Sequence, residues 1–232
     1  MRRAWIIGIV VALLMPMRCA AQWRVGMSAG TDYNFYMIDK HYLLDYRYLG
    51  EWGFTVGVNG RYDFFPWLGL KAELNMTQKN HRMTRYVRTG MNYHYWNYYM
   101  QLPVMVNFSF GAVNDRDGNA RSGKVRGFVN LGFYGGYWVA SRLTGTDYNY
   151  FSHPAEIIEL HENGLNPKRD QRWDCGPVGG IGIEYKCAEH WAIQFECRYY
   201  YSLLSARKNT EHVKDPAYNS PLVLQFSFDY IF

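Results

Sequence analysis

The sequence lacks the long apolar runs from which helical membrane proteins are built. Its longest apolar run, Trp5–Leu14, is shorter than the about 20 residues that a helix needs to cross a bilayer. The mean hydropathy is −0.34, yet 18% of the 232 residues are aromatic. This composition excludes a protein of transmembrane helices. It is compatible with membrane-spanning strands, in which every second residue is polar.

An excess of one charge and metal-binding patterns are also missing. Residues 1–21 contain three arginines and no acidic residue, which leaves 22 basic and 20 acidic residues and a net charge of +2 in the remainder. Such a balance does not indicate a nucleic-acid-binding protein. Because no Cys-x-x-Cys or paired-histidine spacing occurs, we expect neither a metal site nor a cofactor.

Cysteine is sparse and odd in number beyond residue 21, where only Cys175, Cys187 and Cys197 occur. At least one of these thiols is therefore free or paired with another chain. If the two segments around them meet at a turn near Ala188, Cys175 lies opposite residue 201. This register argues against a disulfide between Cys175 and Cys197.

The N-terminus has the parts of a secretory signal peptide. Two arginines precede the apolar run, and small residues occupy positions 19–21. We expect cleavage after Ala21, so that residues 1–21 are the signal peptide and residues 22–232 form one domain. A lipoprotein that begins at Cys19 is the less favoured alternative, because the preceding Arg18 is charged and bulky where small residues are required.

The C-terminal segment shows the pattern of a barrel strand most clearly. Six large apolar residues share one face of it, at Leu222, Leu224, Phe226, Phe228, Tyr230 and Phe232. The other face carries smaller and more polar residues, including Gln225, Ser227 and Asp229. A strand between hydrocarbon and a polar lumen requires this alternation. The aromatic residues Phe228, Tyr230 and Phe232 also resemble the signal that the barrel insertion machinery reads.

Seven further segments have the same strand character, and the connections between them alternate in length. The eight predicted strands cover residues 23–36, 51–64, 67–80, 93–110, 125–140, 173–186, 190–204 and 220–232. Shorter turns at 65–66, 111–124 and 187–189 alternate with longer loops near 37–50, 81–92, 141–172 and 205–219. The chain is therefore predicted to be all-β, an eight-stranded antiparallel transmembrane β-barrel with short periplasmic turns and long extracellular loops, located in the cell outer membrane.

The polar faces of the predicted strands carry charges of both signs. Charged groups buried in a narrow lumen have to be paired, so we predict a charge network inside the barrel. Its members are Arg61, Lys71, Glu73, Glu184, Glu196 and Arg198. Glycines of the same inward parity make room for bulky side chains such as Tyr134. Because side chains fill the interior of an eight-stranded barrel, we do not expect a wide pore.

Three segments carry a resemblance to a known family. Asn97–Phe108 is similar to the strand of tyrosines followed by Ile-Pro or Leu-Pro in the PorT-like outer-membrane β-barrel proteins common in Bacteroidetes. Trp173–Tyr185 and Phe195–Ser202 resemble their two following strands. The resemblance implies the fold and an outer-membrane location in a Gram-negative cell. Cys175 and Cys197 depart from the pattern, which has apolar residues or alanine there. PorT itself is tied to protein secretion.

A basic cluster near the second long loop is a candidate binding site for phosphate. Its four non-histidine members are Lys79, Arg82, Arg85 and Arg88. Cations at the base of an extracellular loop could hold the phosphates of lipopolysaccharide. A solvated loop without a ligand is the alternative.

The third long loop contains ionisable groups and is the one place where a helical turn is conceivable. His153, Glu156, Glu159 and His161 could in principle bind a metal or act as acid and base, but nothing in the sequence fixes their geometry. The favoured interpretation is a solvated loop whose apolar residues, Ile157, Ile158 and Leu160, pack over the barrel mouth. The aromatic rim of Tyr93, Tyr95, Trp96, Tyr98, Tyr148 and Tyr150 is better explained by anchoring at the membrane interface than by binding a partner or glycan.

These patterns predict an integral outer-membrane β-barrel protein without enzyme activity, since the histidines fall in loops or at a turn. Its role would be structural, or one of interaction through the extracellular loops. A component of a protein secretion or outer-membrane assembly complex and a narrow small-solute channel are the alternatives. Expected partners are outer-membrane lipid and lipopolysaccharide, the barrel insertion machinery and a protein of an outer-membrane assembly, but not nucleic acid. A soluble calycin-like barrel conflicts with the charged inner faces.

Overall fold

The computed structural model describes residues 22–38, 45–85, 91–111, 125–149, 156–208 and 216–232. Within these ranges the regular structure consists of antiparallel strands. They are β1 (Gln22–Ile38), β2 (Tyr46–Gly50), β3 (Trp52–Phe65), β4 (Leu68–Gln78), β5 (His81–Arg85), β6 (Asn92–Gly111), β7 (Val125–Asn149), β8 (Glu156–Asn163), β9 (Trp173–Ala188), β10 (Trp191–Tyr200) and β11 (Ala217–Ile231). No helix in the described ranges is long and apolar enough to cross a membrane. The predicted signal peptide, residues 1–21, lies outside them.

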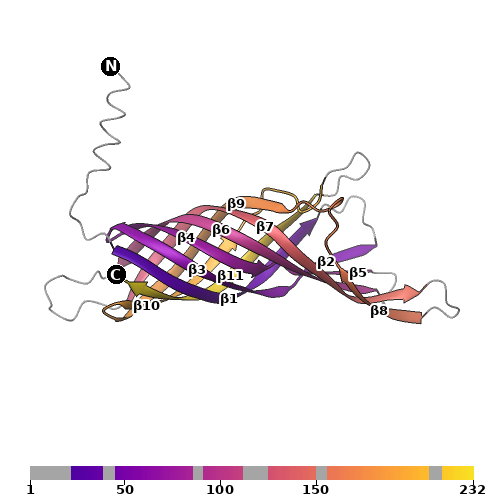
Figure 1. Ribbon diagram of the computed structural model, residues 1–232, viewed down its shortest axis with the longest axis horizontal. Helices are drawn as coiled ribbons and strands as arrows, with labels where there is room; N and C mark the ends of the chain where they lie inside the picture. The colour runs from indigo at the N-terminus through magenta and orange to yellow at the C-terminus, as the bar shows by residue number, and fades with distance from the viewer. Residues whose placement is uncertain (1–21, 39–44, 86–90, 112–124, 150–155, 209–215) are drawn as a thin grey trace, which may run out of the picture.

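Eight of the strands close into a barrel. The ring runs β6-β4-β3-β1-β11-β10-β9-β7 and is completed by the pairing of β7 with β6. The strands wind steeply around the long axis, and β1 begins at the same rim where β11 ends (Figure 1). Closure pairs the backbone groups of every strand with two neighbours, which is what a sheet in hydrocarbon requires. The predicted eight-stranded antiparallel barrel is confirmed.

The connections between strands are short at one rim of the barrel and long at the other. At one rim, β3 passes into β4 through Pro66 and Trp67, and β9 passes into β10 through Glu189 and His190. We call this end the turn rim and the opposite end the mouth. At the mouth, β1 and β3 are separated by the short strand β2, and β7 and β9 by β8. The predicted alternation of tight turns and long connections is therefore present in the described residues.

The mouth contains three strands where the sequence predicts only loops. β5 pairs with β6, from His81 opposite Tyr95 to Thr84 opposite Asn92, and β2 pairs with β5. β8 pairs along eight residues with the end of β7, which continues nine residues past its predicted end. Together β2, β5, β8 and the upper parts of β6 and β7 form what we call the mouth sheet. In Figure 1 the β7–β8 hairpin extends beyond the barrel.

The interpretation of residues 152–162 as a loop or helical turn was wrong for the part that the structure describes. Glu156–Asn163 is a strand, because the β-branched Ile157 and Ile158 favour extended backbone and β7 offers a free edge to pair with. These two isoleucines do not pack over the mouth. Their exposed fractions are 59% and 39%.

The outer wall is apolar between two belts of aromatic residues. The lower belt, near the turn rim, consists of Trp23, Tyr62, Trp67, Tyr185, Trp191, Tyr230 and Phe232. The upper belt, below the mouth sheet, consists of Tyr33, Trp52, Trp96, Tyr137, Trp173 and Tyr201. Ten residues of a strand tilted by about 40° rise by about 25 Å, the usual height of the lipid-facing band. The segments between the belts span the membrane.

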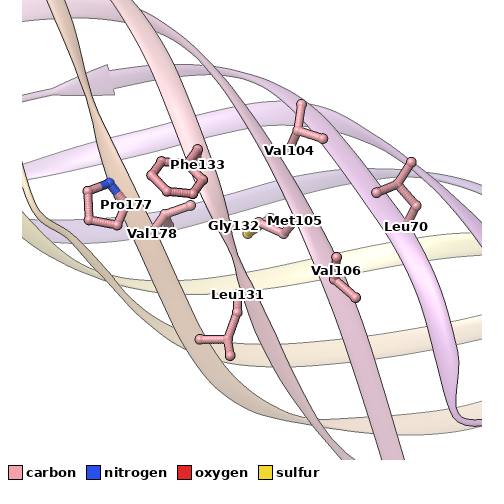
Figure 2. A pocket seen from close by; sticks show the side chains of 9 residues that line it. All are labelled: Leu70, Val104, Met105, Val106, Leu131, Gly132, Phe133, Pro177 and Val178. Atoms are coloured by element: carbon pink, nitrogen blue, oxygen red, sulfur yellow. The ribbon is translucent and has the colours of Figure 1, made fainter. Parts of the chain in front are cut away.

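A shallow hollow interrupts this wall across β4, β6, β7 and β9 (Figure 2). Its lining is apolar and consists of Leu70, Val104, Met105, Val106, Leu131, Gly132, Phe133, Pro177 and Val178. Because no charged side chain lines it and it lies between the belts, the hollow suits an acyl chain of lipid. It offers no recognition of a polar ligand.

The three cysteines that follow residue 21 are free. Cys197 pairs across the sheet with Ile181, and the carbonyl of Cys175 accepts a hydrogen bond from the backbone of Leu203 at 2.9 Å. Residue 203 therefore lies opposite Cys175, two residues from the predicted position 201, and Cys175 does not face Cys197. The prediction that these two do not form a cross-strand disulfide is confirmed.

Candidate functional site

The barrel interior holds stacked layers of paired charges, and the lowest layer lies near the turn rim. There the Glu184 carboxylate accepts hydrogen bonds from Arg24 at 2.9 Å, from Arg126 at 2.7 and 3.0 Å, and from Arg61 at 3.3 Å. Asp63 pairs with Arg61 at 2.5 Å and with Arg24 at 2.8 Å. Three guanidinium groups thus share two carboxylates from strands on opposite sides of the ring.

The middle layer is centred on Arg198, whose exposed fraction is 0%. Its two terminal nitrogens donate to the two Glu73 oxygens at 2.7 and 2.8 Å, a bidentate geometry, and its Nε and Nη2 donate to Glu196 at 2.9 and 2.7 Å. Lys71 lies 2.8 Å from Glu73 and 3.5 Å from Glu196. Two cations and two anions therefore neutralise one another at the centre of the barrel.

Gln194 joins the two layers. Its amide nitrogen donates to Glu184 at 3.0 Å and to Asp229 at 2.6 Å, and its oxygen accepts from Lys71 at 3.5 Å. All six residues of the predicted lumen network lie in the interior. Arg61 and Glu184 belong to the lower layer, and the other four form the middle layer.

Several members of the lower layer were not among the residues predicted from the sequence. Arg24, Asp63 and Arg126 follow the same inward parity as the predicted residues and could have been found by continuing it to the strand ends. Glycine makes room for these groups. A Cβ at Gly180 would overlap the Glu196 carboxylate, so only glycine leaves the space that the Arg198 pair occupies.

An upper layer lies below the mouth and contains Lys79. Its amine lies 2.5 Å from Asp174 and about equally far from the rings of Tyr99 and Tyr134, at 5.0 and 5.1 Å. Asp174 also accepts from Ser202 at 2.6 Å and from the Tyr134 hydroxyl at 3.2 Å. Lys79 is fully buried inside the barrel, so its prediction as a lipopolysaccharide contact was wrong.

Together the layers fill the cross-section of the barrel. The largest fully buried side chains are Arg61, Arg198, Tyr99, Tyr200, Lys71, Lys79, Phe128, Met105, Gln101, Gln194, Gln225 and Glu73. Most of them are polar and bound to a neighbour on another strand. The interior is a solid plug of side chains and not a water-filled passage of constant width.

A cluster of aromatic and basic residues closes the plug at the mouth. The His81 ring stacks between Tyr36 and Tyr95, with ring centroids 3.9 and 4.6 Å apart and planes within 8° of parallel. Arg207 donates to the Tyr48 hydroxyl at 3.3 Å. Burial, together with the positive charges of Arg207 and Arg169, lowers the pKa of His81 to about 3. His81 is therefore neutral at physiological pH.

The rest of the predicted basic cluster separates over two faces of β5. Arg85 faces inward, where it stacks on Tyr46 at 4.5 Å and pairs with Asp45 at 3.3 Å. Arg82 faces outward and pairs with Glu51 at 2.9 Å. Arg88 lies outside the described residues. Of the three members that the structure describes, Arg82 is the one whose side chain points outward.

The ionisable groups of β8 do not form a site. Glu159 and His161 are both strongly exposed and 3.9 Å apart, and His153 lies outside the described residues. Within the described part of the chain no group of three His, Cys, Asp or Glu residues could hold a metal.

Most residues of the predicted aromatic rim have roles in the wall and the mouth. Tyr93 donates to Asp147 at 2.6 Å, and Trp96 donates to Thr144 at 3.1 Å within the upper belt. Tyr150 lies outside the described residues. Of the predicted insertion signal, Phe228 and Phe232 face the lipid, with exposed fractions of 48% and 68%.

Comparison with known proteins supports the fold. A family model described as outer membrane protein beta-barrel domain matches residues 17–206. The outer membrane protein OprG from Pseudomonas aeruginosa is similar in structure, with a TM-score of 0.50 and 10% identity over 92% of this chain and 97% of that chain. Outer Membrane Protein W from E. coli has a TM-score of 0.46 and 16% identity over 93% of this chain and 100% of its own. No curated protein matches the sequence.

The middle layer predicts a large cost for removing its central cation. In the variant Arg198→Leu, Glu73 and Glu196 would share only Lys71, so the free energy of unfolding should fall by about 3–5 kcal/mol. Urea unfolding in lipid vesicles, followed by tryptophan fluorescence, measures it. Arg142→Leu, on the exposed outer face, is the control and should change the value by less than about 0.5 kcal/mol. Equal effects of the two variants would refute the structural role of the plug.

The buried His81 predicts a pH dependence of stability. Because its pKa is lower in the folded than in the unfolded state, where it is 6.5, the unfolded chain binds more protons between pH 6.5 and 3. Stability should therefore fall as the pH falls through this window. His81→Phe should flatten the dependence, whereas the exposed His161→Phe should not. An NMR titration that shows His81 protonating above pH 5.5 would contradict the assignment.

Proposed function

This chain belongs to the outer membrane protein beta-barrel domain family and lies in the outer membrane, and from that premise we propose that it is a closed, non-enzymatic barrel that acts through its mouth sheet. The observation that carries the proposal is the plug of paired charges. A barrel that conducts solutes needs a continuous wet path, and here Arg198, Tyr200 and Lys71 occupy the axis with exposed fractions of at most 1%. The role of a narrow channel is thereby disfavoured.

The non-enzymatic role is supported by the contacts of three of the four described histidines, the fourth being the exposed His161 of β8. His81 is stacked between tyrosines, His94 pairs with Glu51 at 2.9 Å, and His190 contacts the carbonyl of Ile231 at 2.9 Å. Hydrolysis on such a barrel requires a histidine that activates a hydroxyl or a water beside a carboxylate. His81 and His190 have structural partners, and the Glu51 carboxylate beside His94 is also held by Arg82, with no hydroxyl bound to His94 among the described residues.

The mouth sheet supports an interaction role. β8 is the last strand in the sheet order of the described residues, so one of its edges has no described neighbour. The strand exposes Ile157 and Ile158 together with Glu159 and Glu162. An exposed strand edge can accept an extended segment of another protein by backbone pairing. We propose that a protein partner of an outer-membrane assembly docks at this edge.

The finer assignment within the family rests on sequence resemblance. The segments Asn97–Phe108, Trp173–Tyr185 and Phe195–Ser202 now map onto β6, β9 and β10, which are ring strands that line the plug. We propose that the chain is of the PorT-like type and serves a protein secretion or assembly complex as an accessory. Insertion by the barrel insertion machinery, with Phe228, Tyr230 and Phe232 as signal, is part of the same proposal.

The plug predicts the absence of conductance. Purified protein in planar bilayers should give no ion current above that of the lipid alone, because no wet path crosses the middle layer. The variant Glu73→Ala/Arg198→Ala, which removes an ion pair together with its bulk, should give measurable current if it inserts. Steady, ohmic current from the native barrel would sink the closed-barrel proposal and favour the solute channel.

If a partner docks at the edge of β8, charged substitutions on that strand should release the partner. Ile157→Lys/Ile158→Lys adds two cations to the edge and should remove a protein that co-purifies with the native chain from outer membranes in mild detergent. Mass determination of the intact particle measures the loss. Ile157→Val/Ile158→Val keeps the edge apolar and should retain the partner. A native particle that contains only one chain and its micelle would count against the interaction role.

A further inference from the structure

We propose that the outward face of the mouth sheet, directly above the upper aromatic belt, is a binding site for the phosphate groups of a phosphorylated glycolipid in the outer leaflet. The site consists of Arg82 on β5, His94 and Trp96 on β6 and Arg142 on β7, with Glu51 as an organising carboxylate. It depends on the outer-membrane location of the barrel. It does not depend on the interaction role proposed for β8.

The strand register places these side chains on one face. Arg82 lies opposite His94, and His94 lies opposite Thr144, so the three form one row across β5, β6 and β7. Trp96 and Arg142 lie opposite each other in the next row toward the membrane. Because directly paired residues point to the same side of a sheet, all of them share the side of Trp96. The neighbouring His81 and Asn97 point inward and are buried.

Glu51 holds the upper row in place. It lies between β2 and β3, outside both strands, and its Oε1 is 2.9 Å from Arg82 and 2.9 Å from Nδ1 of His94. The Arg82 side chain nevertheless remains 40% exposed, since the carboxylate engages one side of its guanidinium fork. The arginine is thus oriented without being covered, which reduces the entropy that a ligand would have to remove.

Arg142 is the second cation of the site. It is exposed, and none of the described residues forms an ion pair with it. Arg47 on β2 adds a third exposed cation to this face, one row above Arg82. Three arginines therefore share this face, and one of them, Arg82, is held by the Glu51 carboxylate. Glu159 of β8 is in the same row as Arg47 but at the far edge of the sheet.

The spacing suits a headgroup with more than one phosphate. Arg82 and Arg142 are two strands apart and offset by one row, which separates their Cα atoms by about 12 Å, from about 4.8 Å per strand and about 3.4 Å per residue. Arginine side chains at this distance can meet at one phosphate or hold two phosphates of one sugar headgroup. The guanidinium fork matches phosphate oxygens in bidentate geometry.

The height of the site selects a lipid as the source of the phosphate. Trp96 belongs to the upper belt, where indole rings lie at headgroup level, and its Nε1 donates to Thr144 in the row of the proposed site. Arg142 lies level with Trp96, and Arg82 lies one row higher, about 7 Å further along the strands. This face is also continuous with the lipid-facing wall below it. A phosphorylated sugar that is anchored by acyl chains in the outer leaflet reaches both arginines.

The experiment compares headgroups that differ only in phosphate. The full barrel in mild detergent is titrated with bisphosphorylated lipid A or with dephosphorylated lipid A, and Trp96-dependent fluorescence and native mass spectrometry report binding. The native chain should bind the phosphorylated form at least about tenfold more tightly, since charge-assisted hydrogen bonds to phosphate are lost in the other. Equal affinities for the two lipids would overturn the proposal.

Matched variants locate the site. Arg82→Gln/Arg142→Gln should weaken binding of the phosphorylated lipid at least about tenfold. Arg85→Gln, on the same strand but facing inward, should leave it unchanged. Heat-dependent gel migration shows whether each barrel is folded, and Arg142→Gln alone, at an exposed position, serves if the double variant is not. Unchanged binding by a folded Arg82→Gln/Arg142→Gln barrel would show that the phosphates bind elsewhere.

A competition experiment distinguishes two sources of phosphate, the headgroup of a lipid and free inorganic phosphate. Inorganic phosphate at millimolar concentration should not displace the lipid, because it lacks the acyl anchor and the second phosphate. Displacement at that concentration would mean that the face takes soluble phosphate, and the lipid proposal would fail. Neither outcome bears on whether β8 binds a protein.

Discussion

Pairing of buried charge is the constraint on which the barrel depends. An unpaired guanidinium or carboxylate in a narrow, dry interior costs several kcal/mol, so each charged side chain that points inward needs a partner from another strand. Arg198 meets this need by binding Glu73 and Glu196 at once, and Glu184 does so by collecting three arginines. The pairs Arg198–Glu73, Arg24–Glu184 and Arg61–Glu184 join strands that are not neighbours in the ring. The plug therefore holds the ring in one shape, which the apolar outer wall cannot do.

The strands that span the membrane were predictable because lipid and lumen impose opposite polarity on alternate residues. That period of two revealed all eight ring strands and the six network residues. It fails above the upper belt, where both faces of β2, β5 and β8 are outside the hydrocarbon and polar residues occur on either side. Lys79 shows a different limit, because the period of two gives its direction but not its partner. Its inward parity follows Lys71 and Glu73, but its partner Asp174 is 95 residues away and no local pattern indicates that pair.

The mouth divides chemical roles between the two faces of one sheet. Its inner face carries His81 and the tyrosines that stack on it, which extends the dry interior upward. Its outer face carries Arg82 and Arg142 beside the membrane. Two arginines only three positions apart, Arg82 and Arg85, thereby serve different environments. A strand separates them by the same alternation that shapes the wall, and a loop would not.

β7 runs without a break from the turn rim to the tip of the hairpin, a length of 25 residues (Figure 1). Its last eight residues carry β8 and rise by up to about 26 Å at about 3.3 Å per residue. The β7–β8 hairpin therefore has a fixed length and begins at the membrane surface. If β8 binds a partner as proposed, the pairing edge stands up to this distance above the membrane, where an extended polypeptide reaches it more easily than a bulky folded domain.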